Sequence, residues 1–366
     1  MAMAGGESEV YGLIKVWASV FSALTYCCAL GKLTRPGAGR LVFVLPIVGL
    51  FLLLPLHLSS VHLCGSTAFF IAWLANFKLL MFALGKGPLA SSNPPLSLPN
   101  FIAVASLPIK IQPNPPQDGG QKAGATKDPQ KGHKSVFNYG IKLLLLGIML
   151  RVYDYSDHLP QVVLWFIYGF HIYFCLEIIL AGAAVLARAA LGMELEPQFN
   201  EPYLSTSLQD FWGRRWNIMV TSILRPTVYE PVLSFSTRLI SRRYAPLPAV
   251  FSTFVVSAIM HELIFYYLGR IRPTWEITGF FLFHGMCLMG EIAIKKQLRL
   301  SRGLPRPLAA FLTFSFVMVT AFWLFLPPLL RCRADIRAFE EYSAIGEFAK
   351  DVLSHMSVSK AFNTSR

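Results

Sequence analysis

Long apolar runs, separated by short polar segments, dominate the pattern of residues along this chain. Each run is close to the roughly 20 residues with which an α-helix crosses a bilayer. The pattern therefore predicts an all-α, multi-pass membrane protein with about eight transmembrane helices and additional interfacial helices. The runs lie near residues 10–30, 41–58, 66–84, 136–153, 159–187, 246–268, 275–294 and 307–330.

The composition supports a membrane location, and the distribution of Lys and Arg explains the positive net charge. Of the 366 residues, 54% are hydrophobic and 14% are charged, whereas soluble proteins carry about 25% charged residues. The net charge of +13 would suit a nucleic-acid partner, but Lys and Arg lie mostly between the apolar runs. That is the pattern of the positive-inside rule. We therefore expect the lipid bilayer as a partner, and no nucleic acid.

Four of the segments between the apolar runs are basic, whereas the segment 59–65 carries no Lys or Arg. Simple alternation of the spans places the positive segments together on the cytosolic side and both termini on the other side. Arg270 and Arg272 run against this arrangement. The positive segments are 31–40, 86–135, 188–245 and 295–306.

The same pattern divides the chain into regions. Residues 1–85 hold N-terminal transmembrane helices. Residues 86–135, rich in Pro, Gly, Ser and Lys, are predicted to form a flexible, basic cytosolic loop. Residues 136–331 form a larger transmembrane bundle, and residues 332–366 form a C-terminal tail.

An ionisable pair, His261-Glu262, stands inside the run near 246–268. A charged side chain at bilayer depth costs roughly 2.5–3.5 kcal/mol, so such residues usually face a protein interior or a water-filled cavity. Histidine is also well suited to move a proton near neutral pH. We therefore predict a buried reaction chamber with His261 as its base; the alternative is a packing histidine bonded to a backbone carbonyl. Glu262 lies about 100° around the helix, so it either assists or braces a neighbouring helix.

A polar and aromatic segment, Asp-Phe-Trp-Gly-Arg-Arg-Trp-Asn at 210–217, precedes that run. The pattern indicates a helix at the membrane interface, with Trp rings at headgroup depth and Arg side chains reaching water. On a continuous helix Trp212 and Trp216 share one face. Gly213 and Asn217 share another. The alternative is an interfacial anchor without chemistry.

The other histidines are less informative. His284 and Glu291 lie two helical turns apart, so they either line the same cavity or form structural pairs with nearby Arg or Lys. His171 is a candidate lining residue, although structural packing is the preferred interpretation. The histidines expected to be solvated are His57, His62, His133, His158 and His355.

These motifs, in this order, resemble the plant wax-synthase branch of the membrane-bound O-acyltransferase (MBOAT) family. The resemblance covers about residues 195–291 and rests on the 210–217 segment, on His261-Glu262, and on Phe283-His284-Gly285 followed by Glu291. The chain departs from the sterol and diacylglycerol acyltransferases of the wider superfamily. Their motif has an acidic residue and a second aromatic residue where Arg214 and Arg215 stand.

The resemblance implies transfer of an acyl group from acyl-CoA to the hydroxyl of a lipophilic alcohol. The preferred acceptor is a long-chain fatty alcohol, giving a wax ester; a sterol, a diacylglycerol or a terpenoid is the alternative. The family's membrane-embedded histidine corresponds to His261, which would take the proton of the alcohol. Its upstream asparagine corresponds to Asn217, which would donate to the thioester oxygen. The residues expected to bind substrate are Trp212, Trp216, Arg214, Arg215, Glu262, His284 and Glu291.

Acyl-CoA is expected as a co-substrate, with its phosphates on basic side chains such as Arg214 and Arg215. Coenzyme A is an excellent leaving group, so we expect no cofactor, no metal and no covalent intermediate. The six cysteines likewise show neither metal-ligand spacing nor a disulfide framework. The expected location is the endoplasmic reticulum membrane.

Two functions of other classes compete with this interpretation. A proton-coupled transporter would use His261-Glu262 as a relay, but the chain shows no internal repeat of the kind that transporters often have. A non-catalytic membrane scaffold leaves the buried pair unexplained.

Overall fold

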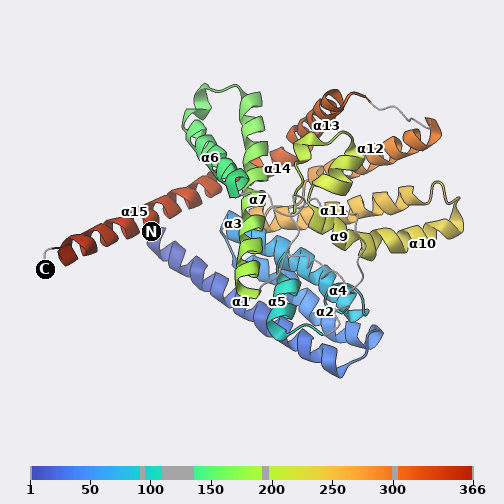
Figure 1. Cartoon of the computed structure of the whole chain (residues 1–366), viewed down its shortest axis with the longest axis horizontal. Coiled ribbons are helices and arrows are strands. Elements are labelled where there is room, and N and C mark those ends of the chain that lie inside the picture. The colour runs from blue at the N-terminus through green and yellow to red at the C-terminus, as the bar shows by residue number, and fades with distance from the viewer. Residues whose placement is uncertain (1, 91–94, 109–135, 192–197, 299–303, 365–366) are drawn as a thin grey trace, which may run out of the picture.

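The computed structural model describes residues 2–90, 95–108, 136–191, 198–298 and 304–364, and every regular element in these ranges is helical (Figure 1). The N-terminal elements are α1 (Ala2–Leu33), α2 (Ala38–Leu53), η1 (Leu54–His57), α3 (Val61–Thr67), η2 (Ala68–Ala75), α4 (Asn76–Ala83) and α5 (Leu98–Ser106). The all-α prediction is confirmed for the described residues.

The larger C-terminal part begins with two long helices and continues through short ones. It comprises α6 (Val136–Val152), η3 (Tyr153–His158), α7 (Gln161–Leu191), η4 (Pro202–Leu204), α8 (Leu208–Asp210), η5 (Phe211–Arg215), α9 (Ile218–Leu224), η6 (Arg225–Tyr229) and α10 (Glu230–Leu239). The remaining elements are α11 (Pro246–Gly269), α12 (Glu276–Leu298), α13 (Arg306–Thr320), η7 (Ala321–Phe325), α14 (Leu326–Arg331) and α15 (Ala334–Thr364).

Within the described residues, 7 helical segments are long and apolar enough to cross a membrane. They span residues 9–33, 38–57, 61–83, 161–189, 246–269, 276–297 and 306–331. The eighth expected span corresponds to α6, which has only 17 residues. At 1.5 Å per residue α6 is about 26 Å long, short of the ~30 Å hydrocarbon core. The multi-pass prediction is confirmed, but α6 is shorter than a full span and packs beside α7.

The rod formed by α3, η2 and α4 is the centre of the bundle. In the apolar stretch of this rod 78% of the residues are buried, whereas the corresponding share in the other candidate spans is 22–39%. The outer spans leave apolar side chains such as Phe311 at the surface, where lipid would cover them. Because the rod is enclosed, its aromatic side chains, including the fully buried Trp73, can form the back wall of an internal site.

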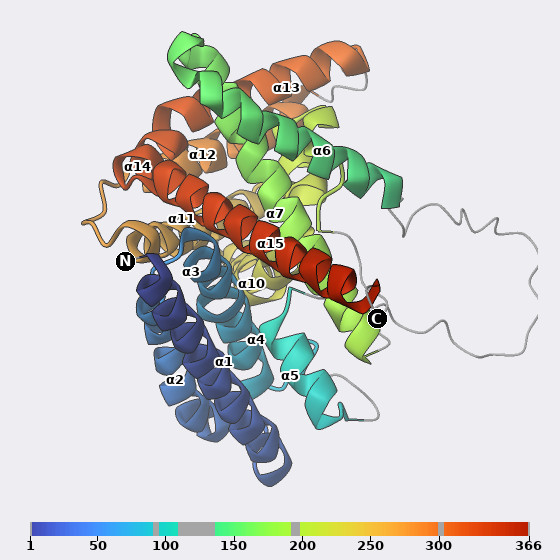
Figure 2. The same cartoon turned by 90° about the vertical axis from the view of Figure 1, so that its left-hand side faces the viewer.

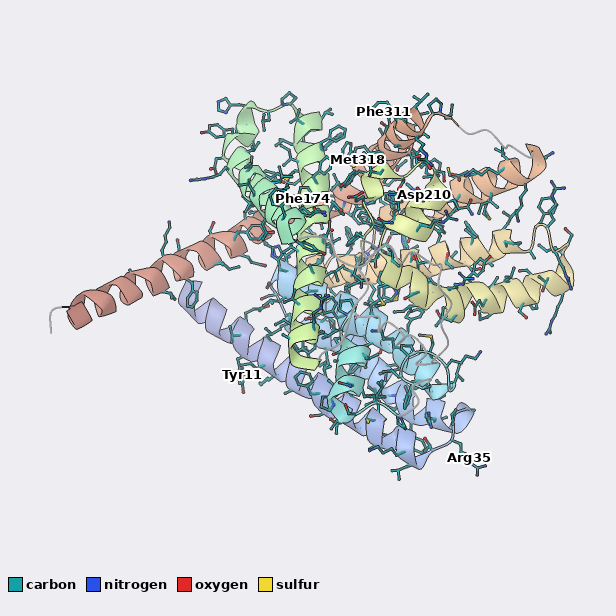
Figure 3. The ribbon with its side chains drawn as sticks, viewed as in Figure 1. Tyr11, Arg35, Phe174, Asp210, Phe311 and Met318 are labelled. Carbon is teal, nitrogen blue, oxygen red and sulfur yellow. The ribbon has the colours of Figure 1, made fainter. Side chains whose placement is uncertain are left out.

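Basic side chains lie at both ends of the bundle. Both termini lie at one end, which faces the viewer in Figure 2, and the α10–α11 turn lies at the other. Arg35, in the α1–α2 turn, is labelled at that other end in Figure 3. There Arg243 donates to the carbonyl oxygen of Lys296 (2.6 Å) and Lys296 Nζ donates to that of Arg243 (2.8 Å). At the end that holds the termini, Arg331 pairs with Glu276 and Arg337 donates to the carbonyl oxygen of Leu268 (2.6 Å). The predicted alternation and its cytosolic side therefore stay predictions.

Arg270, which ran against the predicted alternation, has a structural role. Its guanidinium donates to the carbonyl oxygens of Pro55 and Leu58, both at 3.2 Å. It therefore joins the end of α11 to the segment between η1 and α3. A cation used in this way says nothing about membrane side, so the positive-inside count does not apply to it.

Part of the predicted flexible loop and the predicted C-terminal tail are helical. Within the predicted flexible loop, α5 buries Phe101 and Val104. The fully buried Lys78 donates Nζ to the carbonyl oxygens of Val104 and Leu107, both at 2.6 Å. The predicted C-terminal tail forms α15. Residues 91–94 and 109–135 of the predicted loop lie outside the described residues.

Candidate active site

His261 is fixed through one ring nitrogen. Its Nδ1 lies 2.8 Å from the carbonyl oxygen of Ser257, one turn earlier on α11. A carbonyl oxygen only accepts hydrogen bonds, so Nδ1 carries the proton and Nε2 is the nitrogen able to accept another. The ring packs against the edge of Trp73 (centroids 5.1 Å apart) and beside Phe281 (4.2 Å). The orientation of the imidazole is therefore defined from both sides.

A cavity of about 380 Å³ lies beside this ring. Most of its wall is apolar and comes from α7, α11, η7, α13 and α14; Met318, labelled in Figure 3, marks the side formed by α13. His261 lines the cavity together with Trp212, Trp216 and Asn217. The structure thus brings the two predicted catalytic residues to one largely apolar cavity. The hydrogen bond from His261 to a backbone carbonyl, which the packing alternative predicts, is present. The imidazole ring also lines the cavity, as the catalytic prediction requires.

The predicted interfacial helix is interrupted at Asn217. Trp216 has an extended backbone, and Asn217 adopts the left-handed conformation (φ 41°), which Asn tolerates better than most side chains. Its Oδ1 accepts a hydrogen bond from the backbone N–H of Val220 (3.3 Å) and caps α9. The expectation that Gly213 and Asn217 share a helical face is therefore wrong. Because the cap uses Oδ1, the Nδ2 group of Asn217 is left as a donor.

Trp212 is held by His284. The indole Nε1–H of Trp212 donates to Nδ1 of His284 (3.2 Å), and Nε2 of His284 lies 2.8 Å from Oγ1 of Thr320. An indole N–H only donates, so Nδ1 accepts and Nε2 carries the proton. His284 is fully buried and is not among the residues that line the cavity. Both nitrogens of His284 are engaged by neutral groups. His284 therefore neither lines the cavity nor pairs with an Arg or Lys, the two predictions made for it, and instead positions Trp212.

The two predicted acidic residues brace the site and do not line it. Glu262 accepts hydrogen bonds from the backbone N–H (3.1 Å) and the hydroxyl (3.0 Å) of Thr278, which joins α11 to α12. Glu291 accepts from the N–H of Leu208 (2.8 Å) at the start of α8 and pairs with Lys295 (2.6 Å). The bracing alternative for Glu262 therefore agrees with its contacts, and Glu291 holds the 210–217 segment against α12.

Arg214 and Arg215 differ in their surroundings. Arg215 donates Nε to Asp210 (2.8 Å) and Nη1 to the carbonyl oxygen of Asn200 (3.2 Å). Arg214 is exposed. Arg215 thus stabilises its own loop, whereas Arg214 is available to a ligand in solution. Trp216 lines the cavity.

The sequence interpretation missed part of the cavity wall. His62, expected to be solvated, and His171, expected to be a packing residue, both line the cavity. Their Nε2 atoms lie 2.7 Å and 3.0 Å from the hydroxyl of Tyr342 on α15. The prediction for His62 was wrong because its partner lies near the other end of the chain, where no local pattern could connect the two.

Comparisons with known proteins identify the family of the chain. The model of the membrane bound O-acyl transferase family matches residues 195–283, which include Trp212, Asn217, His261 and Phe283. The proteins similar to the chain over most of its length are plant O-acyltransferases, so the class indicated by the motifs is also the class of the relatives. The chain belongs to the membrane bound O-acyl transferase family.

Particular relatives carry more specific names. Acyl-CoA–sterol O-acyltransferase 1 of Arabidopsis thaliana is 51% identical over 340 residues, covering 93% of this chain and 96% of that protein. The long-chain-alcohol O-fatty-acyltransferase of Simmondsia chinensis is 45% identical, covering 95% and 97%. A probable long-chain-alcohol O-fatty-acyltransferase of Arabidopsis thaliana is 43% identical, covering 94% and 98%.

Proposed function

We propose that this protein transfers an acyl group from acyl-CoA to the hydroxyl of a lipophilic alcohol, with His261 as the general base. The observation that carries the proposal is the orientation of His261. Its Nδ1 is held by Ser257, and its ring lines an apolar cavity that Asn217 also lines. The names of the relatives support the same class of reaction.

The chemistry follows from these groups. The alcohol oxygen attacks the thioester carbon while Nε2 of His261 accepts its proton, a contribution worth roughly 10²–10⁴-fold. The Nδ2 group of Asn217 donates to the carbonyl oxygen as negative charge develops there. The carbon–sulfur bond then breaks, and the imidazolium returns the proton to the coenzyme A thiolate. The proton taken from the alcohol ends on the coenzyme A thiol, and the acyl group passes directly to the alcohol oxygen. The proposed route therefore needs neither a metal nor a covalent enzyme intermediate.

Coenzyme A is proposed to bind beside the 210–217 segment. Arg214 is the favoured phosphate contact, because it is exposed beside the loop that leads to Asn217. Arg215 is already paired with Asp210, so its role is to shape that loop. The acyl chain would enter the apolar cavity while the polar head of coenzyme A stays in water.

The acceptor is proposed to be a long-chain fatty alcohol, as the motifs indicate and as several relatives are named. A sterol is the second candidate, supported by the relative that is 51% identical. Both acceptors are elongated and apolar with one hydroxyl, which suits a cavity lined by aliphatic and aromatic side chains.

The deciding experiment incubates membranes containing the protein with labelled acyl-CoA and separate long-chain-alcohol, sterol, diacylglycerol and terpenoid acceptors. Ester formation that requires the acceptor and is lost in His261→Gln supports the proposal, and the best acceptor names the substrate class. Proton-driven uptake of a solute without ester formation would instead identify a transporter. We also propose residence in the endoplasmic reticulum membrane, to be checked by co-migration with a marker enzyme of that membrane in a density gradient.

A further inference from the structure

Helix α15 begins at the level where several candidate membrane spans end. It starts shortly after one span, and the guanidinium of Arg337 donates to the carbonyl oxygen of Leu268 (2.6 Å), near the end of a second. Glu341 accepts from the hydroxyl of Ser60 (2.9 Å), the residue before a third. These spans are residues 306–331, 246–269 and 61–83. The first turns of α15 are therefore attached at the level of a membrane surface.

Exposed aromatic side chains lie at the same level. Trp275 is exposed directly before α12, whose first residue, Glu276, pairs with Arg331 at the end of α14. Tyr155 is exposed in η3, whose Tyr153 packs its ring on Phe339 of α15 (centroids 4.5 Å apart). Trp and Tyr are enriched where a membrane meets water. The start of α15 is therefore at the depth of the lipid headgroups.

The outer part of α15 carries an exposed apolar stripe. Ile345, Phe348 and Val352 are 65%, 71% and 41% exposed. Their spacing of three and four residues places them on one face of the helix. The exposed residues around the rest of this stretch are polar: Glu347, Lys350, Asp351 and Ser354. A helix divided in this way is typical of segments that lie along a membrane surface.

The same helix does not cross the membrane by length and composition. Among the described residues α15 is not one of the candidate spans, because charged residues recur along it. Figure 1 shows its outer part running away from the bundle towards the C-terminus. The apolar stripe therefore needs a cover that the bundle does not provide.

We propose that residues 343–354 lie in the headgroup layer of the bilayer, with the apolar stripe directed towards the acyl chains. Lipid is favoured over a second copy of the chain, because α15 starts at the membrane surface that the adjoining spans define. The polar face carries Glu347 and Asp351 against Lys350. Since basic residues are what anionic headgroups attract, a zwitterionic lipid is sufficient here.

This surface goes beyond the proposed acyl transfer and has a consequence for it. Ala338 and Phe339, on the first turns of α15, line the cavity. A helix seated in lipid along its outer part is held at both ends, which keeps that wall of the cavity in place.

The test uses the full-length protein in vesicles of phosphatidylcholine that carries an alkyne-tagged acyl chain. The photoreactive residue p-benzoylphenylalanine replaces Phe348 in one variant. In the matched control it replaces Lys350, about 200° around the helix. In a third variant it replaces Phe311, which is exposed on a candidate span and confirms capture of lipid. After irradiation, positions 348 and 311 should carry lipid, and position 350 should not.

Two pairs of substitutions test the stripe itself. With the photoreactive residue at position 348, Ile345→Ser combined with Val352→Ser should remove most of the lipid adduct, because the apolar face is lost. Glu347→Gln combined with Asp351→Asn changes exposed charges on the polar face and should leave the adduct unchanged.

Three outcomes overturn the proposal. A cross-linked dimer in place of the lipid adduct at position 348 would assign the stripe to a second copy of the chain. No lipid at position 348, while position 311 captures it, would place the stripe in water. Equal capture at positions 348 and 350 would show that α15 does not present one face to the bilayer. An adduct that forms only after phosphatidylglycerol is added contradicts the assignment to zwitterionic lipid.

Discussion

Nδ1 of His261 and the carbonyl oxygen of Ser257 lie 2.8 Å apart, one turn from each other on α11. This bond leaves Nε2 as the nitrogen that can accept a proton. A base must present the correct nitrogen before the substrate arrives. The backbone of α11 therefore orients the imidazole without a carboxylate partner.

The first prediction concerns His261. His261→Gln keeps a polar side chain but cannot accept a proton at neutral pH, so kcat should fall by at least roughly 10²-fold at wild-type protein abundance. The measurement is ester formation at saturating acyl-CoA, normalised to protein in the membrane. If the loss of activity is explained by a loss of protein from the membrane, His261 has a packing role and is not the base.

The second prediction separates the two roles of Asn217. Asn217→Asp keeps the helix cap but removes the amide donor, so the fold should be retained while kcat falls by roughly 10²–10³-fold. Asn217→Gly, which tolerates the left-handed backbone, should show the same loss of kcat with little loss of stability. Normal turnover in a well-folded Asn217→Asp enzyme would remove Asn217 from the chemistry.

The third prediction makes His284 a positioning residue. Gln can donate to Thr320 and accept from Trp212, so His284→Gln should retain most activity, in contrast with the same substitution at His261. Trp212→Phe and His284→Ala should be non-additive, because both break one hydrogen bond. A His284→Gln enzyme that is abundant but inactive would instead make His284 the candidate base.

The fourth prediction distinguishes the neighbouring arginines. Arg214→Ala should raise KM for acyl-CoA with little change in kcat, because a phosphate contact lies far from the reacting carbon. Arg215→Ala breaks the partly buried pair with Asp210 and should mainly lower protein abundance. Steady-state kinetics and immunoblotting of the two variants check this, and equal effects at both positions would contradict it.

The fifth prediction concerns pH. Burial raises the pKa of Glu341, but hydrogen bonds from His62 and from backbone N–H groups outweigh it and hold the pKa below its ordinary value of 4.5. The contribution of Glu341 to stability is therefore present above pH 4.5 and is lost as pH falls through the lowered pKa. Glu341→Gln should reduce the loss of Tm between neutral and acidic pH. An identical pH profile for wild type and Glu341→Gln would show that this contact does not stabilise α15.

Most of the helical architecture follows from local pattern. The apolar runs predicted the spans because enough consecutive apolar residues must become a helix inside a bilayer. The same argument selected His261, because an ionisable side chain at bilayer depth is costly and is usually found at a functional site. The local pattern overlooked α5, whose short apolar stretch stands among Pro and Gly residues. It also extended the interfacial helix to Asn217, whereas η5 ends at Arg215.

What each side chain does within the site was decided by tertiary structure. His284 and Trp212 are 72 residues apart, and His62 and Tyr342 are 280 apart. Hydrophobic periodicity reports which face of a helix is buried, but a hydrogen bond depends on which helices then pack together. The sequence alone thus determined a membrane protein with a buried histidine and its family. Only the packing of η5 against α12 decided that His284 positions a tryptophan. The packing of α11 against α12 decided that Glu262 braces a helix, and that of α15 against α3 decided the surroundings of His62.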